Sequence, residues 1–160
     1  MNEYDYVVFE IDDVRLAVPS SVVDKVERAV QLTAVPDGPE SVLGVVSDGG
    51  EIVPVLGLRT RFGMKERDIR LSDRLLFCRS CGRRIAVIAD SVQAVSEIAP
   101  EKCRSSAEIW PGVLFIESVA DIDGDVVLVQ DMDAVLNSEL ELKLDDILRA
   151  LRLRSTEEVD

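Results

Sequence analysis

The chain has 160 residues, of which 47% are hydrophobic and 31% charged, so it can form a globular domain whose core needs neither disulfides nor metals. Its net charge of −13 would repel a nucleic-acid backbone or an anionic bilayer, so we expect neither nucleic-acid binding nor direct membrane binding. Because the N-terminus lacks the features of a signal peptide and no apolar run is long enough for a bilayer, we expect a cytoplasmic protein.

The first predicted element is a β-hairpin. Residues 4–11 alternate between apolar and polar side chains, Asp12 and Asp13 form a polar turn, and residues 16–18 return as a second strand. Pro19 then ends that strand, because proline cannot donate a hydrogen bond to a neighbouring strand.

A short helix is predicted next. Ser21 and Asp24 have the spacing of a capping box, and a helix here would place Val22, Val23 and Val26 on one apolar side. Valine has low helix propensity, so this helix would depend on packing.

The most informative stretch is residues 44–62, which reads as a strand, a glycine turn at residues 48–50, a second strand and a short helix. The same design recurs 74 residues later, where Gly124 corresponds to Gly50, and the first hairpin recurs at residues 75–87. Two copies of a pair of hairpins predict a mainly β fold with two similar small barrels.

Between the halves, residues 63–73 are too polar for a core and form an exposed link. The next hairpin tip carries Arg79, Arg83 and Arg84, which either bind carboxylates of a partner or form an ordinary solvated turn. Trp110 either packs at the edge of a subdomain or contacts a partner.

The clearest helix is near the C-terminus. Ser138 and Glu141 form a capping box, and we expect a helix over residues 139–153 and a flexible tail over residues 154–160. Apolar residues recur at helical spacing: Leu140, Leu144, Ile147, Leu148 and Leu151. This apolar side either packs on the chain's own barrel or docks in a groove of a partner.

Catalytic and metal-binding motifs are absent from the sequence. There is no histidine, no serine or cysteine has the surroundings of a nucleophile, and the carboxylates are scattered. Cys78 and Cys81 have CxxC spacing, but only Cys103 could be a third ligand, so incidental thiols are favoured over a metal site. We therefore expect no enzyme activity, no cofactor and no metal.

Several stretches together resemble the CheW family, the cytoplasmic coupling proteins of bacterial chemotaxis. The resemblance runs from about Tyr6 to Ser138 and is carried by YVVFEI, LAVPSSVVDKV, EIVPVLGLRTRF, RRIAVIADSVQAV and DGDVVLVQDMDAVLN. It implies one domain over residues 4–138, built as two five-stranded β-barrels with a groove between them. The subdomains would cover about residues 15–73 and 74–138, with the first strand shared or exchanged.

The resemblance also implies a function and its surfaces. The protein would be a non-enzymatic adaptor that joins the cytoplasmic tip of a methyl-accepting chemoreceptor to the regulatory domain of a CheA-type histidine kinase. The receptor-groove candidates are Val23, Lys25, Val26, Gly49, Val92 and Val95. The kinase-contact candidates are Gly44, Val45 and Val46.

Two positions depart from the family pattern. Gly49 replaces an arginine that family members present at the receptor groove, and Lys25 stands where a glutamate is common. Loss of this polar pair predicts weakened or retargeted receptor binding. Two alternatives stay open: a diverged CheW-like adaptor in a non-chemotactic two-component pathway, or a small-ligand-binding β-barrel, which would need a polar pocket with convergent titratable groups.

Overall fold

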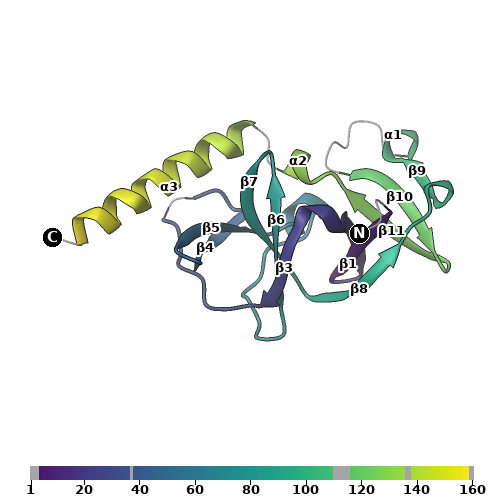
Figure 1. Ribbon diagram of the computed structural model, residues 1–160, viewed down its shortest axis with the longest axis horizontal. Coiled ribbons are helices and arrows are strands. Elements are labelled where there is room, and N and C mark those ends of the chain that lie inside the picture. The colour runs from purple at the N-terminus through teal and green to yellow at the C-terminus, as the bar shows by residue number, and fades with distance from the viewer. Residues whose placement is uncertain (1–3, 37, 110–115, 136–137, 159–160) are drawn as a thin grey trace.

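The computed structural model describes residues 4–36, 38–109, 116–135 and 138–158. Figure 1 shows two β-sheets and one long helix, which confirms the prediction of a mainly β fold. The expectation for Trp110 lies outside the described residues.

The strands form a six-stranded sheet with the order β8-β1-β2-β11-β10-β9 and a five-stranded sheet with the order β3-β6-β7-β5-β4. The strands are β1 (Asp5–Ile11), β2 (Val14–Pro19), β3 (Val23–Arg28), β4 (Val42–Asp48), β5 (Glu51–Leu56), β6 (Arg74–Ser80), β7 (Arg83–Ala89), β8 (Ser91–Glu97), β9 (Cys103–Ser105), β10 (Ile116–Ile122) and β11 (Asp125–Gln130). The helices are α1 (Ser106–Ile109), α2 (Met132–Val135) and α3 (Ser138–Glu158), with 3-10 turns at Ser20–Val22, Arg59–Phe62 and Pro100–Lys102. Two five-stranded barrels are thus only an approximate description.

The five-stranded sheet curls back on itself. After β3, the chain returns to the opposite edge of the sheet, where Thr33 and Val45 exchange two backbone hydrogen bonds of 2.9 Å. These bonds partly close the sheet into a barrel.

The two sheets exchange hairpins between the two halves of the sequence. The β1–β2 hairpin pairs with β8 and β11, whereas the β6–β7 hairpin pairs with β3 and β5. Each sheet therefore takes one hairpin from each half of the sequence, that is, from either side of residue 73. The exchange depends on two parallel contacts, β2 with β11 and β5 with β7, which need long connections and leave no local sequence signal.

The segment predicted as a short helix after Pro19 is mostly a strand. Only Ser20–Val22 is helical, without a side-chain cap, and β3 begins at Val23. In β3, Val23 lies opposite Cys78 and Val26 opposite Leu76 of β6. Pairing along β6 outweighs the capping-box spacing, because β-branched residues suit a strand better than a helix.

The largest core lies between the two sheets and takes residues from both, such as Phe9 and Leu16 from one and Leu76 and Ile85 from the other. We call it the central core. A second core lies within the five-stranded sheet around Phe77, and a third within the six-stranded sheet.

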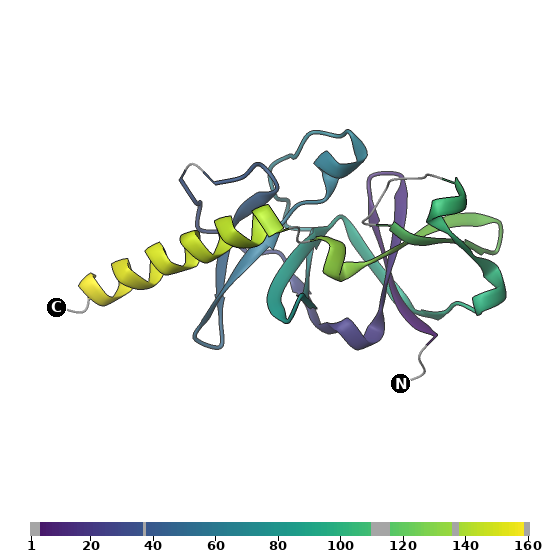
Figure 2. The same ribbon diagram turned by 90° about the horizontal axis from the view of Figure 1, so that it is seen from above.

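Helix α3 starts at Ser138, as the capping signal predicts, and continues to Glu158 through part of the expected tail. Leu140 and Leu144 belong to the central core, whereas Leu142 is 67% exposed. Figure 2 shows α3 leaving the region between the sheets and projecting past the five-stranded sheet. The first part of its apolar side therefore packs on the chain itself.

We expect Leu144→Ala to lower the free energy of unfolding by about 2 to 5 kcal/mol, because the side chain is fully buried in the central core. Thermal or urea unfolding measures this. Leu142→Ala is the matched control on the same helix and should change stability by less than about 0.5 kcal/mol. Equal effects of the two substitutions would show that α3 does not pack as described.

Candidate functional site

Asp90 lies where the chain passes from β7 into β8, and so from one sheet to the other. Its Oδ1 is 2.5 Å from Nη2 of Arg59 and 2.6 Å from Nη2 of Arg67, and its Oδ2 accepts the backbone N–H of Asp12 at 2.7 Å. The Arg59 side chain is only 4% exposed. One carboxylate therefore ties the β1–β2 turn, the 3-10 turn after β5 and the link before β6 to the crossing between the sheets.

A second carboxylate orders the link. Asp73, whose side chain is 2% exposed, receives two hydrogen bonds of 2.8 Å from the Arg67 guanidinium and one of 2.8 Å from the backbone N–H of Arg70. Burial alone would raise the pKa of Asp73 and of Asp90. The hydrogen bonds from Arg67 and Arg59 outweigh burial, so both pKa values lie below that of an ordinary aspartate.

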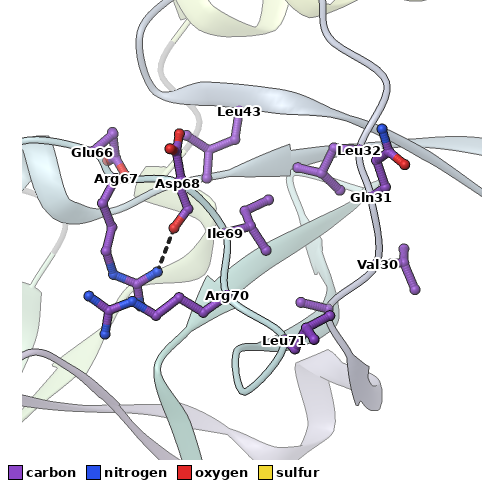
Figure 3. Close-up of a pocket in the computed structure, with 11 residues that line it drawn as sticks. Val30, Gln31, Leu32, Leu43, Glu66, Arg67, Asp68, Ile69, Arg70 and Leu71 are labelled. Atoms are coloured by element: carbon purple, nitrogen blue, oxygen red, sulfur yellow. Dashed lines mark hydrogen bonds between the residues drawn. The ribbon is translucent and has the colours of Figure 1, made fainter.

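Next to this link lies a cavity of about 600 Å³, lined by residues 29–32, Leu43 and residues 66–71. We call it the Leu71 groove (Figure 3). Leu32, Leu43 and Ile69 pack against the core of the five-stranded sheet, while Leu71 is 91% and Val30 55% exposed. The groove is apolar in its floor and charged along its rim.

The kinase-contact candidates Gly44, Val45 and Val46 lie on β4 and are all buried. A Cβ atom on Gly44 would come within 2.7 Å of the Thr33 carbonyl oxygen and 2.9 Å of Leu32 Cβ. The chain at residues 32–33 thus packs directly against β4 at Gly44, and the Leu71 groove lies next to this strand.

The receptor-groove candidates occupy three separate elements. Val23, Lys25 and Val26 lie on β3, Gly49 in the β4–β5 turn, and Val92 and Val95 on β8. Val23 and Val92 both pack against the central core, while Val26 and Val95 are exposed. Strands β3 and β8 are edge strands of different sheets, so both are open to a partner.

Lys25 has a carboxylate partner that the sequence pattern did not reveal. Its Nζ is 2.7 Å from Oδ1 of Asp48, the strand residue just before Gly49, and 3.0 Å from Oε1 of Glu27. Arg84 binds the other oxygen of Asp48 at 2.6 Å. The polar pair inferred to be lost is therefore present with its signs reversed, with the cation on β3 and the anion at the turn.

An aromatic ring lies beneath this pair. Lys25 Nζ is 5.0 Å and the Arg84 guanidinium 5.1 Å from the centre of the Phe77 ring, within the range of cation–π attraction. Hydrogen bonds from Lys25 and Arg84 lower the pKa of Asp48, and the hydrogen bond to Asp48 raises that of Lys25. Asp48 and Phe77 were not predicted from the sequence as parts of this site, and Arg84 was noted only as a hairpin-tip arginine. Only the pairing of β3, β6 and β7, with the β4–β5 turn beside them, brings these residues together.

The arginines at the β6–β7 tip bind carboxylates of the chain itself. Arg83 pairs with Asp145 of α3, Arg84 with Asp48, and Arg79 lies 3.9 Å from Asp24. These contacts favour the reading of a structural turn over that of a partner site.

The three cysteines lie in different surroundings: Cys78 is buried, Cys103 is partly buried and Cys81 is exposed. Burial raises the pKa of Cys78 to about 12, so this thiol is unreactive. Within the described ranges, no three cysteine, aspartate or glutamate side chains are grouped so as to hold a metal ion. No described helix is both long and apolar enough to cross a membrane.

A sequence profile for the CheW-like domain, "CheW", matches residues 5–140, which include every strand of both sheets. The chain belongs to the CheW-like domain family. As a CheW-like domain it is a scaffold rather than an enzyme, and the sequence resemblance is confirmed. Most of α3 lies beyond the matched residues.

Individual relatives agree with this assignment. Protein FrzA of Myxococcus xanthus is 38% identical over 98 residues, which cover 60% of this chain and 60% of FrzA. The probable chemotaxis protein CheW of Rhizobium etli is 22% identical over 135 residues, which cover 83% of this chain and 87% of that one. The crystal structure of the scaffolding protein TtCheW from Thermoanaerobacter tengcongensis shares the fold, with a TM-score of 0.76 and 23% identity over 87% of this chain and 96% of TtCheW.

We expect Asp90→Asn to lower the free energy of unfolding at pH 7 by about 1 to 3 kcal/mol, because Arg59 then keeps a buried charge without its closest anion. Since folding lowers the pKa of Asp90, its contribution is complete above the unfolded pKa of about 3.9 and is lost as the pH falls through the folded value. The difference from wild type should stay constant from about pH 7 to pH 5 and shrink below about pH 4.

Urea unfolding across this pH range tests the expectation for Asp90. Asp123→Asn is the control, because Asp123 is an exposed turn residue with φ of 52°, a conformation that asparagine tolerates. A difference for Asp90→Asn that persists undiminished into acid would rule out the ionised carboxylate as its source.

The close approach of residues 32–33 to β4 predicts that Gly44→Ala is destabilising by about 1 to 3 kcal/mol, because the new Cβ would displace this segment. Gly49→Ala is the comparison, since no atom lies within 4 Å of its Cβ position and only its φ of +60° causes strain. Equal stability losses in urea unfolding would show that the segment does not press on β4.

Proposed function

We propose that this chain is a cytoplasmic adaptor in bacterial chemotaxis that couples the tip of a methyl-accepting chemoreceptor to the regulatory domain of a CheA-type histidine kinase. The observation that carries this proposal is the CheW-like match across residues 5–140, which covers both sheets and both candidate surfaces. The names of the Rhizobium and Thermoanaerobacter relatives support it.

The receptor surface is proposed to lie along β3, the β4–β5 turn and β8. Val26 and Val95 supply exposed apolar contacts there, and Lys25 with Asp48 supplies a polar pair. Because this pair carries the cation on β3, its receptor should present charges in the order opposite to that of a typical CheW receptor. The reversal changes which receptor is selected rather than abolishing receptor binding.

A second candidate function is an adaptor of the same kind in a two-component pathway other than chemotaxis. Two observations favour it: the relative at 38% identity is named FrzA rather than CheW, and the charge pair is reversed. A screen of receptor-tip fragments from the native organism separates the two, according to whether the fragment bound comes from a chemotaxis receptor.

We expect Lys25→Glu to weaken binding of the cognate receptor tip about tenfold to hundredfold, because it places a third carboxylate beside Asp48 and Glu27 and so reverses the charge that this surface presents to the receptor. Binding of the kinase regulatory domain should stay within about twofold. Isothermal titration of both partners measures the two effects.

Two double variants complete this test. Lys25→Glu with Asp48→Lys restores attraction with the opposite sign, and Lys25→Glu with Gly49→Arg recreates the charges common in the family. Both should shift binding towards receptor tips from typical CheW systems. If all three variants bind the cognate receptor tip as wild type does, the pair has no part in receptor selection.

A further inference from the structure

Three arginines beside the Leu71 groove have no carboxylate partner among the described residues: Arg28 at the end of β3, Arg74 at the start of β6 and Arg70 in the link before β6. Arg28 and Arg74 lie directly opposite each other in the β3–β6 ladder, an arrangement that is destabilising for like charges. Arg74 donates to the carbonyl oxygens of Ser72 and Asp73 at 2.8 and 3.0 Å, and Arg70 lines the groove. In a chain of net charge −13, these cations form a local site for anionic groups.

The acidic residues of the groove leave these arginines unpaired. Glu66 turns its carboxylate inward, where Oε1 accepts the backbone N–H of Thr60 at 3.2 Å and Oε2 lies against Gly57. Asp68 is exposed, and its carbonyl oxygen accepts a hydrogen bond from Arg67. Figure 3 shows Arg67 and Arg70 extending to the same side of the groove, away from Leu71.

Leu71 is held out in solvent by an ordered link. The Asp73 carboxylate fixes Arg67 and the backbone N–H of Arg70, and the Asp73 N–H returns to the Arg70 carbonyl at 3.0 Å. An apolar side chain that is 91% exposed on a fixed turn is pre-organised for a partner, because no ordering of the turn is needed on binding.

We propose that the Leu71 groove binds a segment of the kinase regulatory domain that presents an apolar side chain flanked by carboxylates. The apolar side chain would contact Leu71 and Val30, and the carboxylates would bind Arg70 and the Arg28–Arg74 pair. This inference rests on the proposed function, and it replaces Gly44, Val45 and Val46 as direct contacts, because the groove is the exposed surface next to that strand. An anionic bilayer fits less well, since the site is concave and the chain carries a net charge of −13.

The test titrates the cognate kinase regulatory domain against the full chain and four variants. Leu71→Ala removes the apolar contact and Arg70→Glu reverses the cation. Val126→Ala on β11 and Arg104→Glu on β9 are the matched controls, because both are exposed residues of the other sheet. Thermal unfolding should be unchanged in all four, since each side chain is exposed.

We expect Leu71→Ala to weaken kinase-domain binding about fivefold and Arg70→Glu to weaken it at least tenfold. The affinity of the Arg70→Glu variant should also depend less on salt concentration than that of wild type. Both control variants should bind within about twofold of wild type. If the kinase domain binds and both groove variants match the controls, the inference is overturned and the proposed function stands. If the kinase domain does not bind at all, both are overturned. If the groove variants instead abolish binding to vesicles containing phosphatidylserine and leave kinase binding intact, the groove is a membrane contact and the inference is wrong.

Discussion

The arrangement of this protein depends on the Asp90 carboxylate, which joins the 3-10 turn after β5 and the link before β6 to the crossing between the two sheets. Arg59 is almost fully buried and would be costly to bury without a nearby anion. Asp90 supplies that anion at the residue where the chain passes between the sheets, and it also binds Arg67 and the backbone of Asp12. The relative position of the sheets and the shape of the link beside the Leu71 groove therefore depend on the same few hydrogen bonds.

Each proposed partner surface includes an edge of the five-stranded sheet. Strand β3 carries Lys25 at one edge, β4 is the other edge, and residues 29–33 run from β3 back to β4. Edge strands are where a sheet can pair with another chain, and here each edge strand carries its own additional feature. At β3 this feature is the ion pair of Lys25 and Asp48 over the Phe77 ring. At β4 it is the segment at residues 32–33 that packs against the strand, with Leu71 nearby.

The candidate site could be predicted only in part. The family resemblance directed attention to Lys25 and Gly49, but it suggested that a polar pair was missing. Asp48 restores the pair from a different position, because the β4–β5 turn brings its carboxylate to β3. Such an exchange involves residues 23 positions apart with no motif between them, so it becomes visible only once the strands are in register. The Leu71 groove could not be predicted for the same reason, since the sequence of residues 63–73 indicates only an exposed polar link.

The sequence by itself determined the hairpins, their internal repeat and the start of α3. These features are local: alternation places one face of each strand towards a core, and glycines such as Gly49 and Gly124 adopt the positive φ that tight turns require. Only the tertiary structure decided that the segment after Pro19 pairs with β6 as a strand, and that the two sheets exchange hairpins. Those outcomes depend on pairing between strands far apart in the chain. The free energy of this pairing comes from burying the apolar faces of both strands together, so no single segment of the sequence encodes it.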